Sequence, residues 1–338
     1  MKKHLLSQFK QYKANLHTHT TVSDGTSTPE QVKEFYKAHG YSIIAFTDHE
    51  VLVEHSDLND ENFLSITGCE YANTDVNDKQ WHFKTTCHLN FLAKQSDNTT
   101  QICYNPAPLK KFVDDEYIKN VKYHGEIFER EHTVECVNHV IAEANKHGFL
   151  VAMNHPWWSM EGFNIFSQYE GCFAVEVFNT ACASMDGFYE FNPFIYDELL
   201  RMGKKVFPIA ADDMHHLKAD GKFEPEALGG FNMISSPSLS YSDVMTAIEN
   251  GDFYASTGPI INEIYVEDGT LILEVEPCSA VFFRTVSRHG KYVYNPDGST
   301  VTRASFRFRE NDEYVYASVK SADGKWAITR AYSISEML

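Results

Sequence analysis

The chain has 338 residues, of which 43% are hydrophobic and 14% aromatic, and its 29 basic and 47 acidic side chains give a formal charge of −18. This length and composition predict one large folded domain with a smaller one beside it, and they exclude a disordered chain. The acidic excess argues against an extended nucleic acid as partner, because that ligand needs Lys and Arg to neutralise its phosphates. Nucleotides are not excluded, since bound metal ions supply local positive charge.

The seven cysteines form no Cys-x-x-Cys pair and their number is odd, which favours a reduced, cytoplasmic protein. Residues 1–8 are basic and then polar, without the ~7–15 apolar residues of a signal peptide. No stretch reaches the ~18 apolar residues of a membrane span. We therefore expect a cytoplasmic protein without membrane association, for which a homo-oligomer is compatible with the sequence.

A strand–loop–helix–strand rhythm runs through residues 1–258. Thr28 can cap a helix that continues through about His39, with Pro29 in its first turn and Gly40 as a stop. A strand follows, and the same pattern recurs with helices near 131–147, 185–201 and 240–250 that precede strands at 149–153, 206–209 and 253–255. Alternating units of this kind predict a parallel sheet.

Residues 94–130 interrupt that rhythm with a Pro-containing and mixed-charge stretch. An unstructured loop of this length is unusual in a compact domain, which favours a lid with short helices of its own. A peripheral insertion without a role is the equally weighted alternative.

After residue 258 the sequence changes to short alternating segments separated by Asp-Gly turns at 268–269, 297–298 and 323–324. This pattern predicts a small antiparallel β domain over residues 259–338, of the sandwich type. It carries no evident catalytic constellation, so packing against the first domain or assembly is favoured over binding of a second substrate.

A histidine pair near the N-terminus is the first chemical signal. His17 and His19 fall on the same face of the chain if it is extended, because side chains repeat every second residue along a strand. Asp24 follows after a short loop. Two imidazoles and one carboxylate make half of a site for Zn, Mn or Fe.

Other strand-like runs also carry residues that can bind metal. They include Thr47-Asp48-His49, Gly68-Cys69-Glu70, Cys87-His88, Asn154-His155-Pro156 and Asp212-Asp213-Met214-His215. In a parallel α/β barrel the C-terminal ends of the strands meet at one mouth, where the catalytic groups lie. The residues therefore predict one shared metal site.

The order of these motifs resembles the polymerase and histidinol phosphatase (PHP) family of metal-dependent phosphoesterases. The resemblance covers roughly residues 13–258 and rests on His-x-His, Thr-Asp-His, a lone Glu, a lone His, Asn-His-Pro and a late Asp-x-His. It implies an α/β fold, a distorted (β/α)7 barrel, that holds two or three divalent ions.

Carried over by position, the resemblance implies three sets of ligands. The first set is His17, His19, Glu70 and Asp213, and Glu70 bridges to a second set completed by His88 and His155. The third set is Asp24, His49 and His215. Many relatives have a histidine where Asp24 stands, so this chain departs from the family pattern at the third ion.

The arrangement predicts hydrolysis of a small phosphorylated metabolite or nucleotide by a hydroxide that bridges two metal ions. Asp213 and His215 are predicted to assist proton transfer in addition to binding metal. Candidates for substrate binding lie on loops or near strand ends, and a structural or solvated role is the alternative for each: Asn179, Trp157, Lys84, Arg130 and Lys218. Trp157 and the adjacent Trp158 could form a stacking wall for a base or another flat leaving group, with packing beneath the loop as the alternative.

Two further functions stay open at this point. A bridging hydroxide can attack carbon as well as phosphorus, so an amide or cyclic-ester hydrolase is one alternative. The other is a non-catalytic, metal-stabilised binding module in which residues 260–338 engage the partner.

Overall fold

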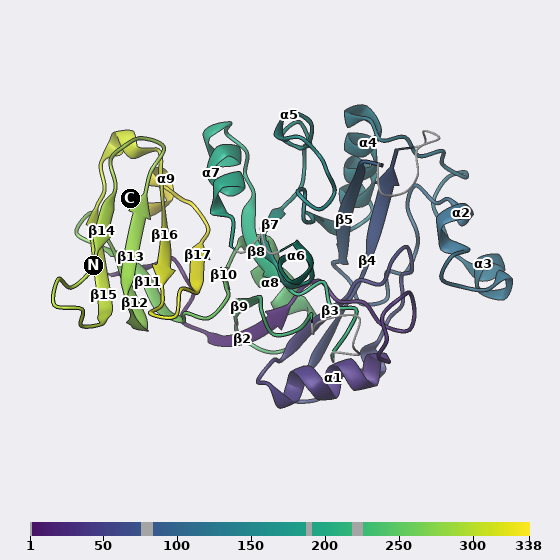
Figure 1. Ribbon diagram of the computed structural model, residues 1–338, viewed down its shortest axis with the longest axis horizontal. Helices are drawn as coiled ribbons and strands as arrows, with labels where there is room; N and C mark the ends of the chain where they lie inside the picture. The colour runs from purple at the N-terminus through teal and green to yellow at the C-terminus, as the bar shows by residue number, and fades with distance from the viewer. Residues whose placement is uncertain (1, 76–83, 187–190, 218–225) are drawn as a thin grey trace.

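The computed structural model describes residues 2–75, 84–186, 191–217 and 226–338. The protein is a mixed α/β molecule built on one large sheet, with a second, four-stranded sheet at one end. In Figure 1 the C-terminal strands lie at one end of the long axis, and the short helices α2 and α3 lie at the other. Among the described residues, no helix is long and apolar enough to cross a membrane.

Eight strands of the large sheet surround the candidate site. Their order is β9-β2-β3-β4-β5-β6-β7-β8, with bounds Phe231–Ser236, Lys10–Asn15, Ile43–Phe46, Leu64–Thr74, Thr86–Ala93, Phe149–Met153, Ala174–Asn179 and Phe207–Ala211. The pairs β2–β3, β3–β4, β6–β7 and β7–β8 are parallel. The pairs β2–β9, β4–β5 and β5–β6 are antiparallel. The prediction of an α/β fold is confirmed, but the sheet is mixed and not uniformly parallel.

The predicted distorted (β/α)7 barrel is not confirmed, because the described strands form no closed barrel. Within the described residues no backbone ladder joins β8 to β9. Phe207 N donates toward β7, so the alternate residues Pro208 and Ala210 face β9. Pro208 has no N–H to offer there, and the Asn232 side chain satisfies Ala210 instead, with Nδ2 donating to its O (2.8 Å) and Oδ1 accepting from its N (3.2 Å).

The helices follow local signals in the sequence. In α1 (Pro29–Ala38) Thr28 and Gln31 form a reciprocal capping box, and Val32 and Tyr36 are buried against the sheet. At the start of two later helices, the N-cap side chains of Thr133 and Ser240 accept hydrogen bonds from Cys136 N and Asp243 N. The remaining helices of this part are α4 (Val134–Lys146), α5 (Phe163–Phe166), α6 (Thr180–Asp186), α7 (Pro193–Arg201) and α8 (Tyr241–Asn250).

Residues 94–130 contain two short helices, α2 (Pro106–Leu109) and α3 (Asp115–Asn120), which are capped by Asn105 and Asp114. The segment reaches the candidate site, since the ring of Phe112 stacks on His49 with 5.4 Å between centroids. Its function as a lid stays a prediction.

The C-terminal strands form two sheets that enclose one apolar core. One sheet has the order β1-β11-β12-β15, with bounds Lys3–His4, Ile261–Glu267, Thr270–Cys278 and Val301–Arg307. The other is β14-β13-β16-β17, with bounds Lys291–Val293, Ala280–Arg284, Tyr314–Lys320 and Trp326–Thr329, and a short strand, β18 (Tyr332–Ser333), pairs with β16. Helix α9 (Ile334–Met337) ends the chain, and the core between the sheets includes Leu271, Val281 and Val315.

The large sheet continues across the predicted domain boundary at 258/259. Strand β10 (Phe253–Ser256) pairs with β9 on one side and with β17 on the other. Strand β1 near the N-terminus pairs with β11, so the first residues of the chain contribute to the C-terminal part. The division into 1–258 and 259–338 stays a prediction.

Candidate metal centre

The first predicted ligand set lies together and buried, with Glu70 within β4 and the other three residues just after the ends of β2 and β8. Asp213 Oδ1 is 3.2 Å from His17 Nε2 and 3.0 Å from His19 Nε2. Glu70 contacts the same two ring nitrogens at 3.3 and 3.4 Å. The two Nε2 atoms are 3.2 Å apart, so four donor groups converge on one point.

The second predicted set shares Glu70 with the first. Glu70 Oε1 is 3.0 Å from His88 Nδ1 and 3.1 Å from His155 Nε2. Asn154 Nδ2 donates a 2.8 Å hydrogen bond to the same oxygen. One carboxylate therefore faces both groups of imidazoles.

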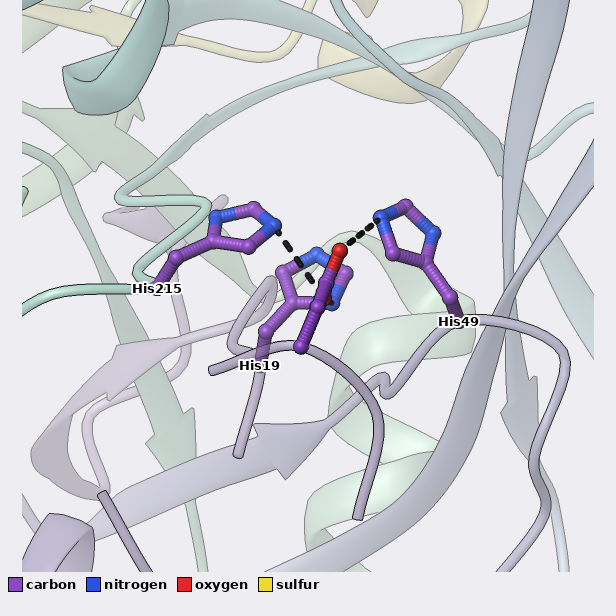
Figure 2. A group of neighbouring side chains, drawn as sticks. His19, His49 and His215 are labelled. Carbon is purple, nitrogen blue, oxygen red and sulfur yellow. Dashed lines mark ion pairs between the residues drawn. The ribbon is translucent and has the colours of Figure 1, made fainter. Parts of the chain in front are cut away.

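The third predicted set lies nearer to solvent. Asp24 is 44% exposed, and its carboxylate lies 3.7 Å from His49 Nε2 and 3.6 Å from His215 Nε2. His19 Nδ1 is 3.9 Å from the same carboxylate. Figure 2 shows the rings of His19, His49 and His215 turned toward one another, and His19 and His215 stack at 4.0 Å.

Backbone pairing brings the ends of β2 and β8 together. Asp213 N donates to His17 O at 3.0 Å, and His19 N donates to Met214 O at 2.9 Å. Asp213 adopts φ +52°, in the left-handed region that side chains other than Gly seldom occupy. A strained residue of this kind is characteristic of functional sites.

The cluster is strongly coupled electrostatically. Burial lowers the pKa of His19, but the adjacent carboxylates of Asp213 and Glu70 outweigh this effect and raise its pKa to about 10. Burial would raise the pKa of Glu70, yet the imidazoles of His88 and His17 hold it well below its usual range. Burial and the adjacent His19 lower the pKa of His215 to about 4.

The donor set fits divalent ions. Two buried atoms in it, His19 Nδ1 and Asp213 Oδ1, have no hydrogen-bond partner within the described part of the chain. Buried polar atoms normally have partners, and imidazole nitrogens with carboxylate oxygens are the ligands that Zn, Mn and Fe prefer. The residues that could hold ions form the three predicted groups and a fourth group, His17, His155 and Glu176, which was not predicted.

Glu176 belongs to the site but was missed by the sequence analysis. Its Oε1 is 2.7 Å from His17 Nδ1, and its Oε2 accepts hydrogen bonds from His155 N (2.8 Å) and Asn179 Nδ2 (3.0 Å). The available signal was a charged residue in the middle of the apolar strand β7. A carboxylate on the far nitrogen of an imidazole fixes the tautomer and orientation of the ring.

Two neighbouring carboxylates anchor the backbone around the centre. Asp48 accepts hydrogen bonds from Thr20 and Ser23, and Asp212 accepts them from Leu228, Gly229 and Gly230. These bonds hold the loops that carry the ligand residues.

A cavity of about 550 Å³ opens over the centre. Of the predicted substrate-binding residues, the buried Arg130 lines it, held through Nη1 by Glu50 Oε1 at 2.7 Å and by Ala72 O at 2.9 Å. Trp157 and Asn179 line a smaller hollow behind the centre instead, and Asn179 also donates to Asp213 Oδ2 at 3.2 Å.

The other two substrate-binding predictions find no support at this cavity. Lys84 is partly buried ahead of β5 and is not among the described residues of the cavity wall. Lys218 lies outside the described residues. Trp158, next to the predicted Trp157, is the tryptophan that lines the cavity.

Fold and site together define a mixed α/β protein with a candidate polynuclear metal centre. Residues 15–151 match the family model of the PHP domain. This match confirms the predicted resemblance to the PHP family over these residues. No curated protein matches the chain.

Three solved structures are similar at low identity. A two-domain protein from Bacteroides vulgatus, containing a predicted PHP-like metal-dependent phosphoesterase, is 15% identical over 97% of this chain and 96% of that chain, with a TM-score of 0.47. A proposed metal-dependent phosphoesterase from Bifidobacterium adolescentis is 16% identical over 62% and 89%, and an amidohydrolase from Chromobacterium violaceum with bound sulfate is 14% identical over 61% and 88%. Both of these have a TM-score of 0.39, and none of the three values carries a function over to this chain.

Proposed function

We propose that the protein is a metal-dependent phosphoesterase that hydrolyses a small phosphorylated molecule. The observation that carries this proposal is the position of Glu70. Its carboxylate lies 3.0–3.4 Å from imidazole nitrogens of His17, His19, His49, His88 and His155, so a single side chain could touch two ions.

The residues proposed to hold two or three ions are the nine predicted ones: His17, His19, Asp24, His49, Glu70, His88, His155, Asp213 and His215. Such ions supply Lewis acidity toward the phosphoryl oxygens and lower the pKa of bound water. Glu176 and Asn179 position the first set through His17 and Asp213.

His215 has a defined protonation pattern in this proposal. Its Nδ1 lies 2.9 Å from Asp213 O, and because a carbonyl only accepts, Nδ1 carries the hydrogen. Nε2 is then left with a lone pair directed toward the third set, where it can bind an ion or accept a proton. Asp213 is proposed to combine the same two roles.

Arg130 is the predicted cationic residue that lines the cavity, and we assign it to the anionic end of the substrate. Its Nε and Nη2 are buried and make no hydrogen bond within the described residues, while Nη1 fixes the side chain. A fixed guanidinium favours oxygen pairs such as those of a phosphate.

The test is phosphate release from a panel of monoesters and diesters by protein loaded with Mn or Zn, with amide and lactone substrates in parallel. His17→Ala and His88→Ala should each lower turnover at least about 100-fold, in the upper range of effects on metal sites. The exposed His124 offers a matched control, because His124→Ala should leave turnover unchanged. Turnover indifferent to the first two variants, or confined to the amide and lactone substrates, would reject the proposal.

A further inference from the structure

The cavity has two chemically different parts. The candidate centre forms its inner end, and a volume of about 550 Å³ lies within the range of sites for small molecules. A phosphoryl group at the centre fills only the inner end. The residues that line the outer part of the cavity therefore contact the rest of the substrate.

Trp158 supplies one side of that wall. It follows β6 in a tight turn, in which Ser159 N donates to His155 O at 3.2 Å. Its ring lies 5.3 Å from His88 and 5.1 Å from His155, measured between centroids, and it is partly buried. The indole is thus in contact with the second ligand set.

Phe112 supplies a second side from a distant segment of the chain. It lies between α2 and α3, and its ring stacks on His49 at an interplanar angle of 22°. The rings of His49 and His88 are 5.7 Å apart. Phe112 and Trp158 therefore border the same centre at adjacent imidazoles.

The remainder of the wall offers little to a charged leaving group. Ala107, Pro108, Ala181 and Met185 add apolar surface. The charged residues of the cavity wall outside the ligand sets are Glu50, Lys111, Glu129, Arg130 and Glu226. Glu50 pairs with Arg130, and Glu226 contacts His216.

From this wall, and resting on the proposed function, we infer that the substrate is a phosphate monoester whose leaving group carries a flat apolar ring. Phe112 and Trp158 determine this specificity by packing against the ring. Aromatic side chains favour offset or edge contacts with such a ring.

The test compares benzyl phosphate with n-propyl phosphate, whose leaving alcohols have similar basicity, so that a difference in rate reports binding of the ring. The wild-type protein loaded with Mn should show a kcat/KM for benzyl phosphate at least about tenfold higher, the size of effect that a small apolar difference has in a hydrophobic pocket. Phe112→Leu and Trp158→Leu should each reduce this ratio several-fold and leave the propyl ester little affected. Phe194→Leu, at a residue 62% exposed on α7, is the matched control and should keep the ratio.

Binding of benzylphosphonate and propylphosphonate, measured by calorimetry, gives a second readout that needs no turnover. Equal kcat/KM values for the two esters, with phosphate released from both, would overturn the inference and leave the proposed function standing. No phosphate release, together with tighter binding of benzylphosphonate that Trp158→Leu abolishes, would overturn the phosphoesterase and keep the ring-binding wall. If neither phosphonate binds, both the proposed function and the inference about the ring are wrong.

Discussion

Glu176 contacts the His17 ring on the edge opposite to Asp213. Its two oxygens contact His17 Nδ1, His155 N and Asn179 Nδ2, and the side chain is fully buried. Since the ligating edge of His17 faces Asp213, the carboxylate acts on the opposite edge of the ring. Its contribution is to orientation and ring basicity.

We expect Glu176→Gln to weaken Mn²⁺ binding about 10–100-fold, the effect usual for the outer partner of a ligating histidine. Calorimetric titration of the metal-free protein measures this change. The control is Glu267→Gln, an exposed residue on β11, which should bind as the wild type does. Unchanged affinity in Glu176→Gln would show that Glu176 is only part of the packing.

Asp24 provides the only carboxylate of the third set, and it is the most exposed of the nine predicted ligands. Because a carboxylate supplies the charge that imidazoles lack, Asp24→Asn should bind one divalent ion fewer per chain than the wild type. Elemental analysis after desalting counts the ions. Asp57→Asn, at an exposed site, serves as control, and an equal count in both variants would exclude Asp24 as a ligand.

The residue scale also shows what a sequence can indicate. The nine ligand candidates could be found because short motifs carry them. Glu176 could not, because one acidic residue in an apolar strand reveals nothing of its partner 159 positions away. The sequence indicated the pair Trp157 and Trp158 but not which ring lines the cavity. Adjacent residues in a turn point in different directions, and only the turn geometry decides between them.

At the scale of elements, Tyr241 on α8 forms hydrogen bonds with the backbone of the sheet. Its hydroxyl donates to Ala93 O at 2.8 Å and lies 3.3 Å from Thr67 N. Burial raises the pKa of Tyr241 to about 12. The helix is therefore attached to β4 and β5 by a group that is protonated at neutral pH.

This attachment predicts a loss of stability at alkaline pH. A tyrosine whose pKa is higher in the folded than in the unfolded protein stabilises the fold fully below pH ~10, and this contribution disappears as the pH rises toward 12. The loss is on the order of 2 kcal/mol. In urea unfolding, Tyr241→Phe should cost about 1 kcal/mol at pH 7. Because only the wild type then loses stability by ionisation, this deficit should shrink and change sign as the pH rises from 10 to 12. A deficit independent of pH would contradict the assignment.

The strands β8 and β9 also show why the described strands form no closed barrel. Alternating helices and strands predict that successive strands lie side by side in a parallel sheet. Whether the first and last strands also pair and close a barrel depends on single backbone N–H donors. Pro208 removes one such donor at the side of β8 that faces β9, and Asn232 substitutes its side chain for the missing ladder. The short connection over 75–85 likewise favours an antiparallel β4–β5 pair, because a parallel crossover needs a dozen or more residues.

At the scale of the whole molecule, the large sheet runs from the candidate centre into the C-terminal strands through β10 and β17. The chain also carries a net charge of −18, with Glu70, Asp213 and Glu176 buried in one place. Buried carboxylates that face one another raise the free energy of the folded protein unless cations compensate them. The centre therefore couples metal binding to global stability.

Removal of metal should lower the melting temperature of the whole protein. An ion present at 100 times its dissociation constant stabilises the folded state by about 2.7 kcal/mol, which for a chain of 338 residues corresponds to a shift of roughly 4 °C. Protein dialysed against a chelator should melt lower by this amount, and Mn²⁺ should restore the original value. The His17→Ala variant separates specific binding from a general salt effect, because its melting temperature should respond little to Mn²⁺ while that of His124→Ala responds fully. Equal melting temperatures for chelated and Mn²⁺-loaded wild-type protein would mean that the cluster binds no stabilising ion.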